Sequence, residues 1–122
     1  MSPDDAMRRI DGLLSHVWMV RTFLKHADEA EDPEIQEIYR ELYDFVLALG
    51  KPWEDKDAAA YLKQAGKKYA KLWAATEKFA EIHAEVSAHT NFQMAARSLL
   101  LAVGEIGEIL EATRHPKPPD LS

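Results

Sequence analysis

The chain has 122 residues, of which 47% are hydrophobic and 30% are charged, and this balance predicts a single globular domain. It contains no cysteine, which excludes disulfides, thiolate metal sites and a cysteine nucleophile, and which fits a cytoplasmic location. The formal net charge of −6 argues against nucleic acid as the main partner. No apolar run approaches the roughly 20 residues that span a bilayer, and the acidic start Met1–Asp5 is not expected to be a secretory signal, so no membrane partner is predicted.

Two helices are predicted in the first half of the chain, each opened by the same kind of start signal. Ser2–Pro3 is typical of an N-cap followed by a first helical turn, and this helix is expected to run to about Asp28. Asp32–Pro33 repeats the signal, and Gly50 should end the second helix. Apolar residues recur every three or four positions in both helices: Ala6, Ile10, Leu13, Val17, Val20, Leu24 and Ala27, then Ile35, Ile38, Tyr39, Leu42, Phe45, Val46 and Leu49.

Two further helices are predicted in the second half, after a short connection over Lys51–Asp55. The third begins near Asp55 or Asp57 and reaches about Glu85, and residues 87–91 form a turn. Its apolar stripe is Ala58, Leu62, Ala65, Tyr69, Leu72, Thr76, Phe79 and His83. The fourth carries Phe92, Ala96, Leu99, Val103, Ile106 and Leu110, and it should stop by Arg114 because prolines follow.

These four stripes predict the architecture. Helices joined by short connections pack as antiparallel neighbours, so the expected fold is an all-α, antiparallel up-down-up-down four-helix bundle. Residues 1–114 should form this single domain, and residues 115–122 a proline-rich C-terminal tail. Tyr69, Leu72, Leu99 and Val103, each in the middle of a stripe, are expected in the main core.

Histidines gather at one predicted end of the bundle. An up-down bundle brings His26, His83 and His89 to the same end, with Glu37 at a similar height. Two imidazoles and a carboxylate suit zinc, so these four residues are a candidate metal site. The alternative is a structural role, in which His83 is buried and hydrogen-bonded while His26 and His89 face water.

Haem is a second possible cofactor. His16, Met19, Phe23 and His26 align along one flank of the first predicted helix, and histidine with methionine or a second histidine can ligate haem iron. The alternative is a half-buried helix side. A ferritin-like di-iron site is not expected, because the chain contains no Glu-x-x-His pair.

Two short patterns resemble those of hydrolases. The spacing of Arg21 and His26 resembles the Arg-x4-His motif of HEPN ribonucleases, although that family carries it late in its bundle. Glu41-x-x-Asp44 and Glu105-x-x-Glu108 are similar to the magnesium-binding carboxylates of all-α nucleotide pyrophosphohydrolases, in reversed order. These resemblances imply an RNA or nucleotide hydrolase as a further alternative, while the chain shows no other catalytic constellation.

An excess of apolar residues indicates a partner surface. The run Leu99–Val103 is apolar on every side of its helix, and Trp18 lies outside the inner stripe of the first helix. Gly104 and Gly107 would permit close approach of another backbone. We therefore expect a homodimer whose interface includes Trp18, Leu101, Gly104 and Gly107. The expected function is a small binding or assembly module, with no catalytic constellation evident in the sequence.

Overall fold

The computed structural model describes residues 1–114 and contains helices but no strands in this range. The elements are α1 (Pro3–His26), the short 3-10 helix η1 (Asp28–Glu31), α2 (Pro33–Ala48), α3 (Gly50–Glu54), α4 (Ala58–Val86) and α5 (Thr90–Arg114). The predicted tail, residues 115–122, lies outside the described residues.

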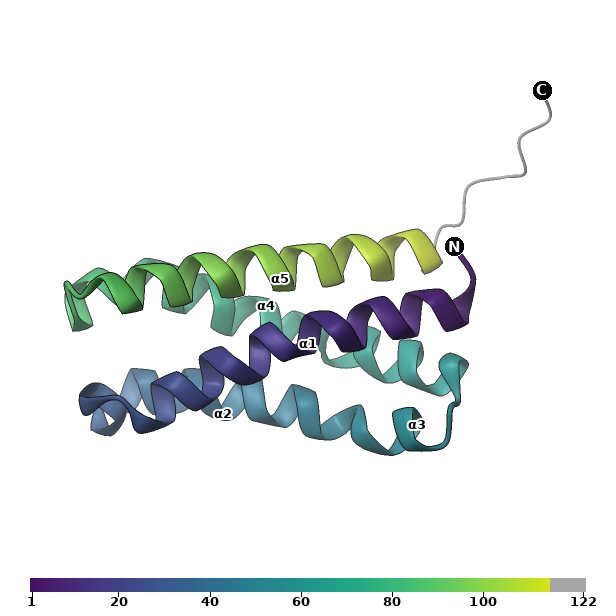
Figure 1. Ribbon diagram of the computed structural model, residues 1–122, viewed down its shortest axis with the longest axis horizontal. Coiled ribbons are helices and arrows are strands. Elements are labelled where there is room, and N and C mark those ends of the chain that lie inside the picture. The colour runs from purple at the N-terminus through teal and green to yellow at the C-terminus, as the bar shows by residue number, and fades with distance from the viewer. Residues whose placement is uncertain (115–122) are drawn as a thin grey trace, which may run out of the picture.

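The four long helices form an antiparallel up-down-up-down bundle, as the sequence predicts (Figure 1). α1 packs against α2 and α5, and α4 packs against the same two helices. Successive long helices reverse direction, so the start of α1 and the end of α5 lie at the same end of the bundle (Figure 1). Grooves lie on the surface between α2 and α4, between α4 and α5, and between α1 and α5.

The predicted helix starts are confirmed by capping hydrogen bonds. The Ser2 hydroxyl accepts a hydrogen bond from the Asp5 backbone N–H at 3.1 Å, and the Asp32 carboxylate accepts one from the Glu34 N–H at 2.9 Å. The Asp57 carboxylate accepts one from the Ala60 N–H at 3.0 Å. Each cap satisfies a backbone donor that has no partner within its own helix, so local sequence defines where α1, α2 and α4 begin.

Two short helices differ from the prediction. α1 ends at His26 rather than near Asp28, and η1 follows it. Gly50 does not end the helical path: it begins α3, and the predicted connection over Lys51–Asp55 is mostly helical. Pro52 is compatible with this turn because it is the third residue of α3, where its missing N–H has no partner to lose within that helix.

The core lies along the predicted stripes, with one shift in α4. Leu72, Leu99 and Val103 are 0–1% exposed, which confirms their predicted place in the core. On α4 the inward positions also include Tyr61 and Ile82, whereas the predicted stripe members Leu62, Tyr69 and His83 are half-buried on its flank.

Tyr69 explains one of the two glycines assigned to a partner surface. Its hydroxyl donates a hydrogen bond to the Val103 carbonyl oxygen at 2.8 Å. A Cβ atom added to Gly107 would lie 2.7 Å from Tyr69 Cζ, which is too close for two carbon atoms. Gly107 is therefore needed for packing between α4 and α5 of one chain. A Cβ atom on Gly104 would meet no atom within 4 Å.

The two glycines should respond in opposite directions to substitution by alanine. Gly104→Ala should raise the free energy of unfolding by up to about 1 kcal/mol, because alanine favours helix over glycine. Gly107→Ala should lower it by about 1–3 kcal/mol, because the Tyr69 ring must move away from α5. Chemical denaturation of both variants at one protein concentration tests this difference, and an equal gain in both would show that Tyr69 does not require the glycine.

Candidate functional site: the grooves between the helices

The predicted zinc ligands line three different grooves. His26 and His89 line a depression of about 300 Å³ at the end of α1, beside the turn that precedes α5. His83 lines a groove between α4 and α5, and Glu37 one between α2 and α4. The bundle thus brings the four residues towards one end but directs them to different sides. No three His, Asp or Glu residues among 1–114 are grouped so that they could hold a metal ion. Zinc binding stays an untested prediction.

The histidines make local contacts. His26 Nδ1 lies 2.9 Å from the Thr22 carbonyl oxygen, and His89 Nδ1 accepts a hydrogen bond from the Asn91 N–H at 3.1 Å. His83 is half-buried, and its Nδ1 atom is enclosed without any hydrogen-bond partner. The prediction that His83 bonds a polar group at this end of the bundle is therefore wrong, although its Nδ1 atom is buried.

The flank of α1 that suggested haem lies partly against α5. His16 Nδ1 lies 3.4 Å from the Ser98 hydroxyl oxygen, and the Phe23 and Phe92 rings meet edge-on with centroids 5.3 Å apart. These contacts account for two of the four aligned residues by packing within one chain. Met19 is exposed. Haem binding also stays an untested prediction.

The Arg-x4-His pair does not converge. The Arg21 guanidinium stacks on two aromatic rings, 4.7 Å from the Trp18 centroid and 4.8 Å from the Tyr43 centroid, so it faces α2. His26 instead lines the depression that it shares with His89. The two side chains therefore leave α1 in different directions, and the resemblance to ribonucleases finds no paired site.

The two carboxylate motifs are also separated. Glu41 and Asp44 line the side of the bundle between α2 and α4. Glu105 lies 3.9 Å from the Arg9 guanidinium, where α5 meets α1. Carboxylates on opposite sides of a bundle cannot share a magnesium ion, so these residues do not form the site that the resemblance implies.

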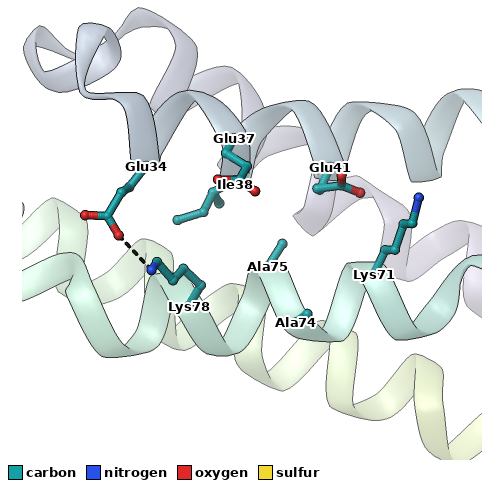
Figure 2. A pocket seen from close by; sticks show the side chains of 8 residues that line it. All are labelled: Glu34, Glu37, Ile38, Glu41, Lys71, Ala74, Ala75 and Lys78. Carbon is teal, nitrogen blue, oxygen red and sulfur yellow. Dashed lines mark ion pairs between the residues drawn. The ribbon is translucent and has the colours of Figure 1, made fainter.

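The groove between α2 and α4 carries opposite charges on its two walls (Figure 2). It has a volume of about 360 Å³, and the small side chains of Ala74 and Ala75 line α4 there. Lys78 Nζ lies 2.8 Å from Glu34 Oε2, and this hydrogen bond raises the pKa of Lys78. The other lining residues are Glu37, Ile38, Glu41 and Lys71. We did not predict these facing charged walls. The sequence carries a signal for them, because acidic residues recur at helical spacing on α2 and lysines recur at helical spacing on α4. Exposed ion pairs contribute little to stability, so the pair between Glu34 and Lys78 adds little to the free energy of unfolding.

A polar pair formed by buried Tyr61 and half-buried Asp11 was also missed. Tyr61 is 0% exposed, and its hydroxyl donates a hydrogen bond to the Asp11 carboxylate at 3.0 Å. Burial raises the pKa of the Asp11 carboxyl above its usual range. Burial and the neighbouring Asp11 charge raise the pKa of the Tyr61 hydroxyl. The pair joins α1 to α4 and is satisfied within the chain, which indicates a structural role.

The predicted partner residues Trp18 and Leu101 do not form one patch. The Trp18 and Tyr43 rings have centroids 6.2 Å apart, so Trp18 lies on the flank of α1 that faces α2. Leu101 lines the groove between α1 and α5. Trp18 is thus explained largely by packing with Tyr43 and Arg21 in the same chain, whereas Leu101 points outward.

Comparison with known proteins adds no relative: no family model, no curated protein and no solved structure matches the chain. Within residues 1–114, no helix has both the length and the apolar character that crossing a membrane requires. A function is therefore inferred from the surfaces of the bundle.

Proposed function

We propose that the protein is a small cytoplasmic assembly module that forms a homodimer through the outer faces of α1 and α5. The observation that carries this proposal is Leu101, whose side chain is 69% exposed in the middle of a long helix. Met94 lies two turns before it on the same side of α5 and is 51% exposed. Met19, on α1 one turn beyond His16, is 66% exposed. We call Met19, Met94 and Leu101 the α1/α5 apolar surface.

The exposure of these three apolar side chains on two neighbouring helices supports association. Single exposed apolar side chains are common on folded proteins, but clustered ones are typical of binding surfaces. Gly104 follows Leu101 by one turn, and a Cβ there would meet no atom within 4 Å, so this part of α5 is open to a second copy even with a methyl group in place. A twofold axis through this surface would bury Leu101 of each copy against the other copy.

Leu101→Glu should shift the protein from dimer towards monomer, because it places a charge inside the proposed interface. Light scattering after size exclusion measures the mass. Leu47→Glu is the matched control, since Leu47 is 63% exposed but lies on α2. The expected result is loss of dimer in the first variant only. Equal masses for both variants and the wild type would contradict the proposed surface.

Metal or haem binding is the alternative function, whereas the residues of both hydrolase resemblances lie apart from one another. The observation that keeps a metal in consideration is that His26 and His89 line one depression together with Asp28 and Glu29. Elemental analysis and an absorption spectrum of protein purified without chelator would reveal stoichiometric zinc or haem. Either result would replace assembly as the main proposal.

A further inference from the structure

We infer a ligand site that is independent of the proposed dimer: the groove between α4 and α5 binds a small organic carboxylate with an apolar body. The groove has a volume of about 320 Å³ and lies near the turn that joins the two helices. Its lining residues are Ala80, His83, Gln93, Ala96, Arg97 and Leu100.

The charge of the groove favours an anion. None of its lining residues is acidic, although the chain has 21 Asp and Glu against 15 Lys and Arg. Arg97 is exposed and forms no ion pair with a carboxylate in residues 1–114. A guanidinium presents two parallel N–H groups that match the two oxygens of a carboxylate. The Gln93 carboxamide adds a further donor on the same helix face, one turn before Arg97.

The His83 ring lines the same groove and can offer a ligand there a hydrogen-bond donor. Its Nδ1 atom is enclosed and has no hydrogen-bond partner. An N–H on this enclosed atom would have no acceptor, which costs more free energy than an unshared lone pair in the same place. The neutral His83 ring therefore carries its proton on the other nitrogen, Nε2. Nε2 is not among the enclosed atoms and bonds no described group, which leaves this N–H for a ligand. The Phe79 ring, with its centroid 6.2 Å away, meets the imidazole edge-on.

The remaining lining selects the ligand class. Ala80 and Ala96 are small, and Leu100 is a 40% exposed apolar edge that a hydrocarbon chain would cover. Arg97 is the one formally charged residue in the lining, which matches a monoanion. A carboxylate attached to a short alkyl or aryl body satisfies both parts of the groove, whereas inorganic phosphate satisfies only the polar part.

Titration with hexanoate tests the site. We expect saturable changes in the NMR signals of the His83 imidazole, with a dissociation constant of about 1 mM or tighter. Hexylammonium, which has the same chain and the opposite charge, should leave those signals unchanged. Arg97→Gln should weaken hexanoate binding about 10-fold or more, because it removes charge-assisted hydrogen bonds. Arg40→Gln is the matched control, an exposed arginine on α2 whose loss should change nothing.

The inference would be overturned by no His83 response at about 50 mM hexanoate, which is far above the expected constant. An equal response to hexylammonium, or unchanged affinity in Arg97→Gln, would overturn it as well. An equal response to inorganic phosphate would also overturn it, because it would remove the requirement for an apolar body. Leu101→Glu should leave hexanoate binding intact, since Leu101 lines the other flank of α5. Failure of the dimer and failure of this site can thus be told apart.

Discussion

Leu72→Ala and Leu99→Ala are each expected to lower the free energy of unfolding by about 2–5 kcal/mol, because each removes a buried side chain and leaves a cavity. Leu72 and Leu99 are 1% and 0% exposed, and both belong to the continuous core of the bundle. Urea denaturation measures the loss. Leu47→Ala is the matched control, since Leu47 is 63% exposed and the same change should cost less than about 0.5 kcal/mol. A loss below about 1 kcal/mol at both core sites would show that the assigned core is wrong.

Tyr61→Phe is expected to lower the free energy of unfolding by about 1–2 kcal/mol at neutral pH, because it removes a hydrogen bond to a carboxylate that is only partly exposed. The folded-state pKa of Tyr61 is raised above its ordinary value of 10.0. Its contribution to stability is therefore fully present below the ordinary value and is lost as pH rises through the folded value. The difference in stability between wild type and Tyr61→Phe should shrink at strongly alkaline pH.

Asp11→Asn separates the hydrogen bond from the charge. Asparagine keeps an oxygen that can accept a hydrogen bond from the Tyr61 hydroxyl. Burial raises the pKa of Asp11, so folding disfavours the charge of this carboxylate relative to the unfolded chain. Asp11→Asn should therefore leave stability at neutral pH unchanged or raise it. A loss as large as that of Tyr61→Phe would mean that the carboxylate charge itself is needed.

Local signals in the sequence predict most of the fold. The caps at Ser2, Asp32 and Asp57 act over three residues or fewer, so they can be recognised without knowing the tertiary structure. Apolar spacing alone likewise places Leu72 and Leu99 in the core. α3 was missed because Gly and Pro usually end helices, and their compatibility with a new first turn depends on the path of the chain beyond them.

The candidate sites were less predictable, because they depend on which way each helix is rotated. Topology gives the height of His26 and His83 along the bundle but not their direction, and a helix turns by about 100° per residue, so side chains at equal height can face different grooves. Gly107 shows the same limit: its packing against Tyr69 joins residues far apart in the sequence. The charged walls between α2 and α4 could likewise be predicted only by knowing that these two helices are neighbours.

Self-association through the α1/α5 apolar surface is the central proposal, and the mass of the wild-type protein in solution tests it most directly. Sedimentation equilibrium over a range of concentrations into the high micromolar range should give a particle of twice the 13.8 kDa chain mass. Dissociation on dilution should follow mass action, with the dimer fraction rising with concentration. A single species of 13.8 kDa at every concentration would contradict the proposed function.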